Sequence, residues 1–387
     1  MIPRIQVDCG IIRGTTIQDT IDEIRIIDNH AHPVESLKAE TVRDSFSSFF
    51  TEGALSANHA RHTLNYRAAL ELLDEQFGES TTSEFSTDET TLLARRAEVD
   101  TETYTRELIA ETNTEIILAD NGFPDVSPKE FQSYTDADVH PIVRIEPIIE
   151  SLYEEYAEFG AFESAFDAAL EDALAGSAVA LKTIVAYRTG LAVGTPDRQA
   201  ARDAFATLED RWTGRIEEPA MLEYLVDRAC QLAGERNVPV QFHTGFGDPD
   251  AHPQQVDPTL LADLIQRHPT TPIVLLHAGY PYVRQSGYVT ATYENAYLDL
   301  SLALPFIQHG CEDMLSAVLE LAPTTKLLYG SDAFSVPELY VLAARRIRDD
   351  LATVLESLVA EGFINHEYAE TIAHNVLREN AIRLYDL

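Results

Sequence analysis

Short apolar runs recur along the chain, and each is followed by a longer stretch in which apolar residues return at helical spacing. This alternation is typical of βαβ units and predicts a parallel sheet. The runs are continuous, as expected for strands buried on both faces. Eight strands favour a closed (β/α)₈ TIM barrel, although counting alone leaves an open doubly wound sheet as an alternative. The runs lie at 24–28, 115–119, 141–145, 179–185, 238–242, 272–276, 296–300 and 326–329.

The length of 387 residues fits one such barrel with an addition, since a (β/α)₈ barrel alone takes roughly 250 residues. Most of the extra length lies between the first and second runs, where a simple connection would be far shorter. That segment contains helical patterns at 66–76 and 92–111. We therefore expect a single α/β domain over 1–387, with a helical lobe inserted at about 34–112 and a smaller insertion at 190–214.

The formal net charge is −36, and only four of the 28 basic residues are lysines. The acidic residues are spread through predicted helices and loops, which indicates a solvated acidic surface rather than a disordered acidic tail. We interpret the surface as adaptation to a salt-rich cytoplasm, where repulsion is screened over about 3 Å at 1 M salt. An ordinary acidic enzyme is the alternative. Such a surface argues against nucleic acids and anionic membranes as partners.

The three cysteines, Cys9, Cys230 and Cys311, are far apart, so they indicate neither a metal motif nor a disulfide framework. The N-terminus lacks the apolar core of a signal peptide, and no stretch of 18 apolar residues occurs. We therefore expect a cytoplasmic protein that acts on a small molecule. The sequence does not determine the oligomeric state and is compatible with a homo-oligomer.

Candidate metal ligands stand where several of the predicted strands end. His30 and His32 follow the first run in IIDNHAHP, and alternation along a strand points both side chains the same way. His243 and His277 end the fifth and sixth runs, and Asp332 follows the eighth. Any one of these could be an ordinary polar residue at a strand end. In barrel enzymes, however, the active site lies at the C-terminal ends of the strands, so their convergence predicts a divalent metal site.

Lys182 lies within the apolar run at 179–185, and a buried, unpaired ammonium group is costly. Three interpretations are open. The amine could react with carbon dioxide to form a carbamate that bridges two cations. It could form a salt bridge inside the barrel, to Glu146 or Asp332. It could also face the outer helices and extend to water.

Substrate-binding candidates follow two of the runs. Tyr187 and Arg188 come after the Lys182 run, and Tyr280 and Arg284 come after the sixth. A guanidinium group can hold a carboxylate with two parallel hydrogen bonds, so an arginine in the site favours an anionic substrate. The alternative for each is a surface or interlobe contact.

The motifs DNHAHP, LKTIVAYRTGL, VQFHTGFGD, LLHAGYPY and YGSDAF resemble the amidohydrolase superfamily. More narrowly, they resemble the amidohydrolase-type domain that is fused to glutamine-synthetase-like domains in some fungal and plant proteins, and its free-standing bacterial and archaeal relatives. The resemblance covers essentially the whole chain. It implies a metal-dependent hydrolase that cleaves an amide or other C–N bond through a metal-activated water.

The resemblance also implies roles for particular residues. His30 and His32 match the histidines that bind the more buried cation, and Asp332 matches the aspartate that is both ligand and general base. His243 and His277 match the strand-five and strand-six histidines. In binuclear members a carbamylated lysine, here Lys182, bridges the metals; in mononuclear members that position is unused and His277 would be a catalytic group beside the metal. The implied cofactor is one or two Zn²⁺ ions, with Mn²⁺ as a substitute.

Two other functions remain open at this point. The same barrel and ligands support a metal-dependent decarboxylase or a uronate-isomerase-like enzyme, because a fold does not settle the reaction. A non-catalytic metal-binding protein is the alternative from another class.

Overall fold

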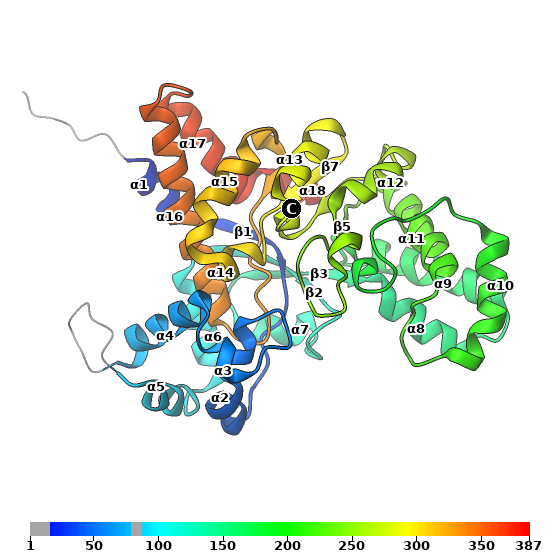
Figure 1. Cartoon of the computed structure of the whole chain (residues 1–387), viewed down its shortest axis with the longest axis horizontal. Coiled ribbons are helices and arrows are strands. Elements are labelled where there is room, and N and C mark those ends of the chain that lie inside the picture. Colours follow the sequence, from blue (N-terminus) through cyan, green and yellow to red (C-terminus); the bar gives the residue numbers. More distant parts are fainter. Residues whose placement is uncertain (1–15, 79–86) are drawn as a thin grey trace, which may run out of the picture.

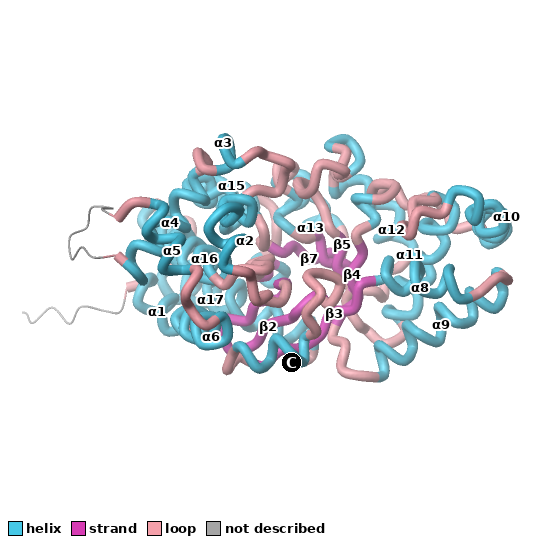
Figure 2. Tube along the Cα trace, turned by 90° about the horizontal axis from the view of Figure 1, so that it is seen from below, coloured by secondary structure: helices cyan, strands magenta, loops and turns pink. Residues whose placement is uncertain are grey.

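Eight parallel strands, hydrogen-bonded in sequence order from β1 to β8, form the centre of the molecule (Figures 1 and 2). This computed structural model describes residues 16–78 and 87–387, so Cys9 and the N-terminal segment lie outside the described residues. Beyond β8 the chain returns to β1, where Asn29 N–H donates to the Tyr329 carbonyl at 3.0 Å and His32 N–H to the Ala333 carbonyl at 2.8 Å. These bonds bring the first and last strands together and confirm the predicted TIM barrel.

All eight predicted runs contain a strand. The bounds are β1 Ile26–Ala31, β2 Thr114–Asp120, β3 Asp138–Arg144, β4 Ala180–Thr183, β5 Val240–Phe242, β6 Ile273–Leu275, β7 Ala296–Asp299 and β8 Leu327–Leu328. Register places Lys182 of β4 between Arg144 of β3 and Gln241 of β5. The strands from β4 onward are shorter than their apolar runs, at one end or at both.

Between β1 and β2 the chain forms helices that lie beside the barrel, blue to cyan in Figure 1. They are α2 Ala39–Ser45, α3 Ala57–Ala60, α4 Leu64–Phe77, α5 Glu89–Arg96 and α6 Thr101–Glu111. The expected helix at 92–111 is divided in two because the Asp100 side chain accepts from Thr103 N–H and caps a new helix. A buried ion pair between Arg96 and Glu338 joins these helices to the long helix α16, Glu338–Ala360.

Most of the remaining helices cover the outside of the sheet, and those from α8 to α11 form the green group on the right of Figure 1. The smaller insertion expected at 190–214 contains α10. The described residues include no helix long and apolar enough to cross a membrane. The helices are α1 Ile17–Glu23, α7 Pro128–Phe131, α8 Ile145–Glu155, α9 Phe159–Ala175, α10 Arg198–Leu208, α11 Pro219–Gly234, α12 Ala262–Arg267, α13 Val283–Thr292, α14 Ala303–Ile307, α15 Cys311–Leu319, α17 His366–His374 and α18 Asn380–Tyr385.

The last helix closes the barrel at the end opposite the strands' carboxyl ends. Leu384 and Tyr385 of α18 pack on a buried apolar layer that includes Ile27, Leu118 and Val274. The Tyr385 hydroxyl donates to Asn29 Oδ1 at 3.0 Å and accepts from Gln241 Nε2 at 2.9 Å. The interior is therefore apolar toward this end and becomes polar toward the other, where the site lies.

Candidate active site

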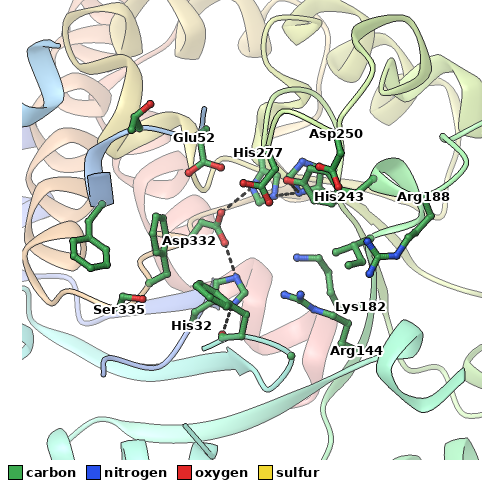
Figure 3. A pocket seen from close by; sticks show the side chains of 18 of the residues that line it. His32, Glu52, Arg144, Lys182, Arg188, His243, Asp250, His277, Asp332 and Ser335 are labelled. Carbon is green, nitrogen blue, oxygen red and sulfur yellow. Dashed lines mark hydrogen bonds and ion pairs between the residues drawn. The ribbon is translucent and has the colours of Figure 1, made fainter. Parts of the chain in front are cut away.

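A cavity of about 570 Å³ opens at the carboxyl ends of the strands (Figure 3). This volume lies within the range of small-molecule sites. Side chains from the strand ends and from the helices inserted after β1 line it together. The lining residues include His32, Glu52, Arg144, Lys182, Tyr187, Arg188, His243, Asp248, His277 and Asp332.

The two histidines of β1 meet Asp332 at the base of the cavity. Nε2 of His30 and Nε2 of His32 lie 3.0 and 3.1 Å from the same oxygen, Asp332 Oδ1. All three residues are buried. Asp332 has a left-handed backbone, φ 50°, and its N–H donates to the His30 carbonyl at 2.8 Å. That bond and the unusual φ turn its carboxylate toward the histidines.

The tautomers of both histidines follow from their other ring nitrogen. His30 Nδ1 donates to Gln241 Oε1 at 2.8 Å, and His32 Nδ1 donates to the Phe123 carbonyl at 2.8 Å. The amide of Gln241 is oriented because its Nε2 donates to the Asn29 carbonyl and the Tyr385 hydroxyl, both at 2.9 Å. Each ring therefore presents a lone pair at Nε2. Gln241 was not predicted from the sequence; the only signal was a polar residue within an apolar run.

These atoms fit a divalent cation. Two lone-pair nitrogens face one carboxylate oxygen, and these are the ligand types that a divalent cation such as Zn²⁺ takes in proteins. Burial, reinforced by Lys182, lowers the pKa of His30 to about 4, so the ring is neutral. Burial alone would raise the pKa of Asp332, but His277, His30 and His32 hold it well below its usual range. Neutral imidazole and ionised carboxylate are the forms that bind metal.

His243 and His277 lie side by side above Asp332, with His277 Nε2 3.0 Å from His243 Nδ1. His277 Nδ1 contacts Ser301 Oγ at 2.9 Å and lies 3.8 Å from Asp332 Oδ2. His243 Nε2 donates to the Phe246 carbonyl at 2.9 Å. Two triads of described residues have potential ligand atoms within 4.8 Å of one another: His30, His32 and Asp120, and His30, His277 and Asp332. His243 belongs to neither triad.

Lys182 points into the barrel. Its Nζ lies 3.0 Å from His30 Nε2 and 3.6 Å from Asp120 Oδ2, and the residue is 2% exposed. The interpretation in which it faces the outer helices is therefore wrong. A salt bridge inside the barrel is present, but the partner is Asp120, and the expected partner Glu146 instead accepts from the Thr183 hydroxyl and Ile184 N–H.

Asp120 and Arg144 were missed in the sequence. They end β2 and β3, so they carry the same positional signal that indicated the histidines. Arg144 donates to Asp120 through Nε at 3.1 Å and Nη2 at 2.7 Å. Burial would raise the pKa of Asp120, but the charges of Arg144 and Lys182 outweigh it and lower that pKa. The carboxylate is thus held ionised between two cations.

The structure places two of the four expected substrate-binding residues in the cavity and the other two away from it. Tyr187 and Arg188 line the cavity, and the Tyr187 hydroxyl lies 3.2 Å from His243 Nδ1. Tyr280 instead packs against Phe246, with ring centroids 5.4 Å apart. Arg284 is on the outside of α13, where its side chain is 68% exposed and pairs with Glu320 at 2.8 Å. The expectation that Tyr280 and Arg284 bind substrate is corrected accordingly.

A (β/α)₈ barrel with a histidine pair on β1, histidines after β5 and β6 and an aspartate after β8 defines a class of metal-dependent enzymes. Comparisons with known proteins find similarities in the same class. Residues 197–387 match the amidohydrolase family. The chain is 26% identical to a Lactobacillus casei protein described as a metal-dependent hydrolase, with a TM-score of 0.86 over 96% of this chain and 98% of that one. The chain is thus similar to the amidohydrolase family over residues 197–387 and to a metal-dependent hydrolase over nearly its whole length.

Two further proteins are similar to this chain, one in sequence and the other in fold. The chain is 30% identical over 413 residues to protein fluG of Emericella nidulans, covering 96% of this chain and 47% of that protein. The chain thus spans about half the length of this curated relative. Uronate isomerase from Thermotoga maritima has a TM-score of 0.68 at 13% identity, over 95% of this chain and 96% of that one. At this identity the likeness shows the fold alone.

Proposed function

We propose that this protein is a metal-dependent hydrolase that cleaves an amide or other C–N bond of a small anionic molecule. The observation that carries the proposal is the convergence of His30 Nε2 and His32 Nε2 on Asp332 Oδ1 at the base of a cavity. A Zn²⁺ ion held by these three residues, or Mn²⁺ in its place, would lower the pKa of a coordinated water toward 7 and polarise the substrate carbonyl.

The chain's own groups supply the proton transfers. Asp332 keeps Oδ2 directed toward the cavity side of the site, beside His277. It would accept a proton from the attacking water and return it to the leaving nitrogen, acting as general base and then general acid. His277, which lines the same cavity, would stabilise the negative charge that develops on the substrate oxygen once its ring turns from His243 toward the substrate.

The number of ions depends on Lys182. Two cations about 3.5–4 Å apart need an anion between them, which a carbamate supplies and an amine does not. Burial lowers the pKa of Lys182, although the carboxylate of Asp120 opposes the shift. Because the side chain already meets His30 and Asp120, we propose a single ion bound by His30, His32 and Asp332. A carbamylated Lys182, with His243 and His277 as further ligands, is the alternative that a metal count tests.

The test is a product assay on the zinc-loaded protein. A panel of N-acyl and γ-glutamyl amino acids is incubated with wild type and with Asp332→Asn, and both amine and carbon dioxide are measured. We expect amine release that falls by about 10²–10⁴-fold in Asp332→Asn. Asp227→Asn is a matched control, because Asp227 pairs with Arg267 and His268 away from the cavity. Carbon dioxide release without amine would overturn hydrolysis in favour of decarboxylation.

A further inference from the structure

Two side chains of opposite charge, Glu52 and Arg188, line the cavity. Figure 3 shows Glu52 directly above Asp332, and Arg188 farther away at the right, beyond Lys182. Glu52 comes from the segment inserted after β1, between the short helix Phe46–Phe50 and α3. Arg188 follows β4. The two side chains thus reach the metal-binding residues from separate parts of the fold.

Most of the other cations of the cavity are already paired. Asp120 neutralises Arg144 and contacts Lys182, and Arg215 pairs with Asp250 and Glu217. Arg188 is paired less closely than these residues. Its side chain is only 10% exposed, its Nη2 donates to Glu150 Oε1 at 3.4 Å, and its Nε is buried without a hydrogen-bond partner. A buried guanidinium N–H of this kind can still donate to a ligand.

Among the acidic residues of the cavity, Glu52 is the one that most needs a partner. It is half-buried, and its side chain forms no hydrogen bond or ion pair with any of the residues that the structure describes. Burial raises its pKa to about 8, and the carboxylates of Asp332 and Asp248 add to that shift. A positive group placed beside Glu52 would relieve both the burial and the repulsion.

We propose that the substrate is a small zwitterion, with a carboxylate bound by Arg188 and a cationic group, such as an ammonium, bound by Glu52. The placement of its scissile bond near Asp332 rests on the proposed function, because Asp332 lines the same cavity as Glu52 and Arg188. The binding of a carboxylate by Arg188 and of a cation by Glu52 depends on the cavity alone and not on which reaction the protein catalyses. It predicts that a ligand with both charges binds more tightly than a ligand with either one.

The experiment uses unreactive probes and the zinc-loaded protein. Isothermal titration calorimetry compares 6-aminohexanoate, which has both charges, with 6-hydroxyhexanoate and 6-aminohexanol, which have one each. 4-Aminobutanoate and 8-aminooctanoate test the spacing. The variants are Glu52→Gln and Arg188→Met, and Glu320→Gln and Arg284→Met are the controls, since those two residues pair on the surface.

We expect the zwitterion of best-fitting length to bind at least about tenfold more tightly than its singly charged partners, since a charge-assisted hydrogen bond contributes about that factor. Glu52→Gln should reduce its affinity to that of the hydroxy acid, and Arg188→Met to that of the amino alcohol. Equal binding of zwitterion and hydroxy acid by wild type, or a preference unchanged in Glu52→Gln, would overturn the inference. A zwitterion preference in a protein that cleaves no amide would leave it standing and refute the proposed reaction instead.

Discussion

Gln241 offers a direct test of how the barrel interior controls the metal site. Its Oε1 accepts the proton of His30 Nδ1 at 2.8 Å, while its Nε2 donates to Asn29 and Tyr385. Gln241→Leu keeps a similar volume and removes all three bonds. At about 1 kcal/mol net per bond, the free energy of unfolding of the metal-free protein should fall by about 3 kcal/mol.

The same substitution should weaken metal binding by about 10- to 100-fold, because nothing then fixes the tautomer and direction of the His30 ring. Tyr385→Phe is the matched control. It removes the bonds from Gln241 Nε2 and to Asn29 Oδ1 but leaves the bond between Gln241 and His30 intact. It should cost about 2 kcal/mol of stability with little change in metal affinity.

The assay pairs urea unfolding of the metal-free variants with zinc competition against a chromophoric chelator. Measuring stability without metal keeps the linkage between binding and folding out of the comparison. Equal losses of zinc affinity in both variants would show that Gln241 acts through general stability and not through the orientation of His30. Unchanged affinity in a folded Gln241→Leu protein would refute the positioning role outright.

Four further predictions follow from the site and the surface. His30→Ala and Asp332→Ala should each lose the bound metal, and unchanged metal content in both variants would contradict the ligand assignment. Protein grown in excess bicarbonate should contain one ion per chain, whereas two ions together with a carbamate mass on Lys182 would establish the binuclear alternative. The melting temperature should rise from about 0.1 to about 3 M KCl as salt screens the net charge of −36, and a flat or falling curve would exclude salt adaptation. Affinity for 6-aminohexanol should increase as pH rises from about 6 toward about 8, because Glu52 ionises through a raised pKa of about 8; the same profile in Glu52→Gln would assign the effect to another group.

The ligand-bearing strand ends could be predicted because they depend on a local rule. A buried parallel strand appears in the sequence as an apolar run. The residue that ends the run lies at the carboxyl edge of the sheet. His30, His32 and Asp332 were found in this way, and the structure brings them together. The same rule applies to Asp120 and Arg144, but without neighbouring histidines an acid or arginine at a strand end looks like an ordinary polar residue.

The substrate side of the cavity could not be predicted in this way, because it depends on long-range packing. Glu52 lies in an inserted segment whose path over the barrel is set by contacts far along the chain. The prediction for Arg284 was wrong because a residue close to a strand end in the sequence can still be carried away from the cavity. His277 and Ala278 take left-handed φ values of 68° and 54°, so the chain reverses after β6 and α13 carries Arg284 to the outer surface.

Some of the non-glycine residues with left-handed backbone lie where the chemistry is proposed. Asp332, His277 and Ala278 all have positive φ, and such residues cost about 1–3 kcal/mol each. They follow β6 and β8, so the same turns that are unfavourable direct Asp332 and His277 toward one another. The compensation lies at the other end of the barrel, where α18 seals a buried apolar layer over Ile27 and Leu118. Tyr385 belongs to that seal and, through Gln241, also orients His30, so the packing that offsets the strain holds a metal ligand in place as well.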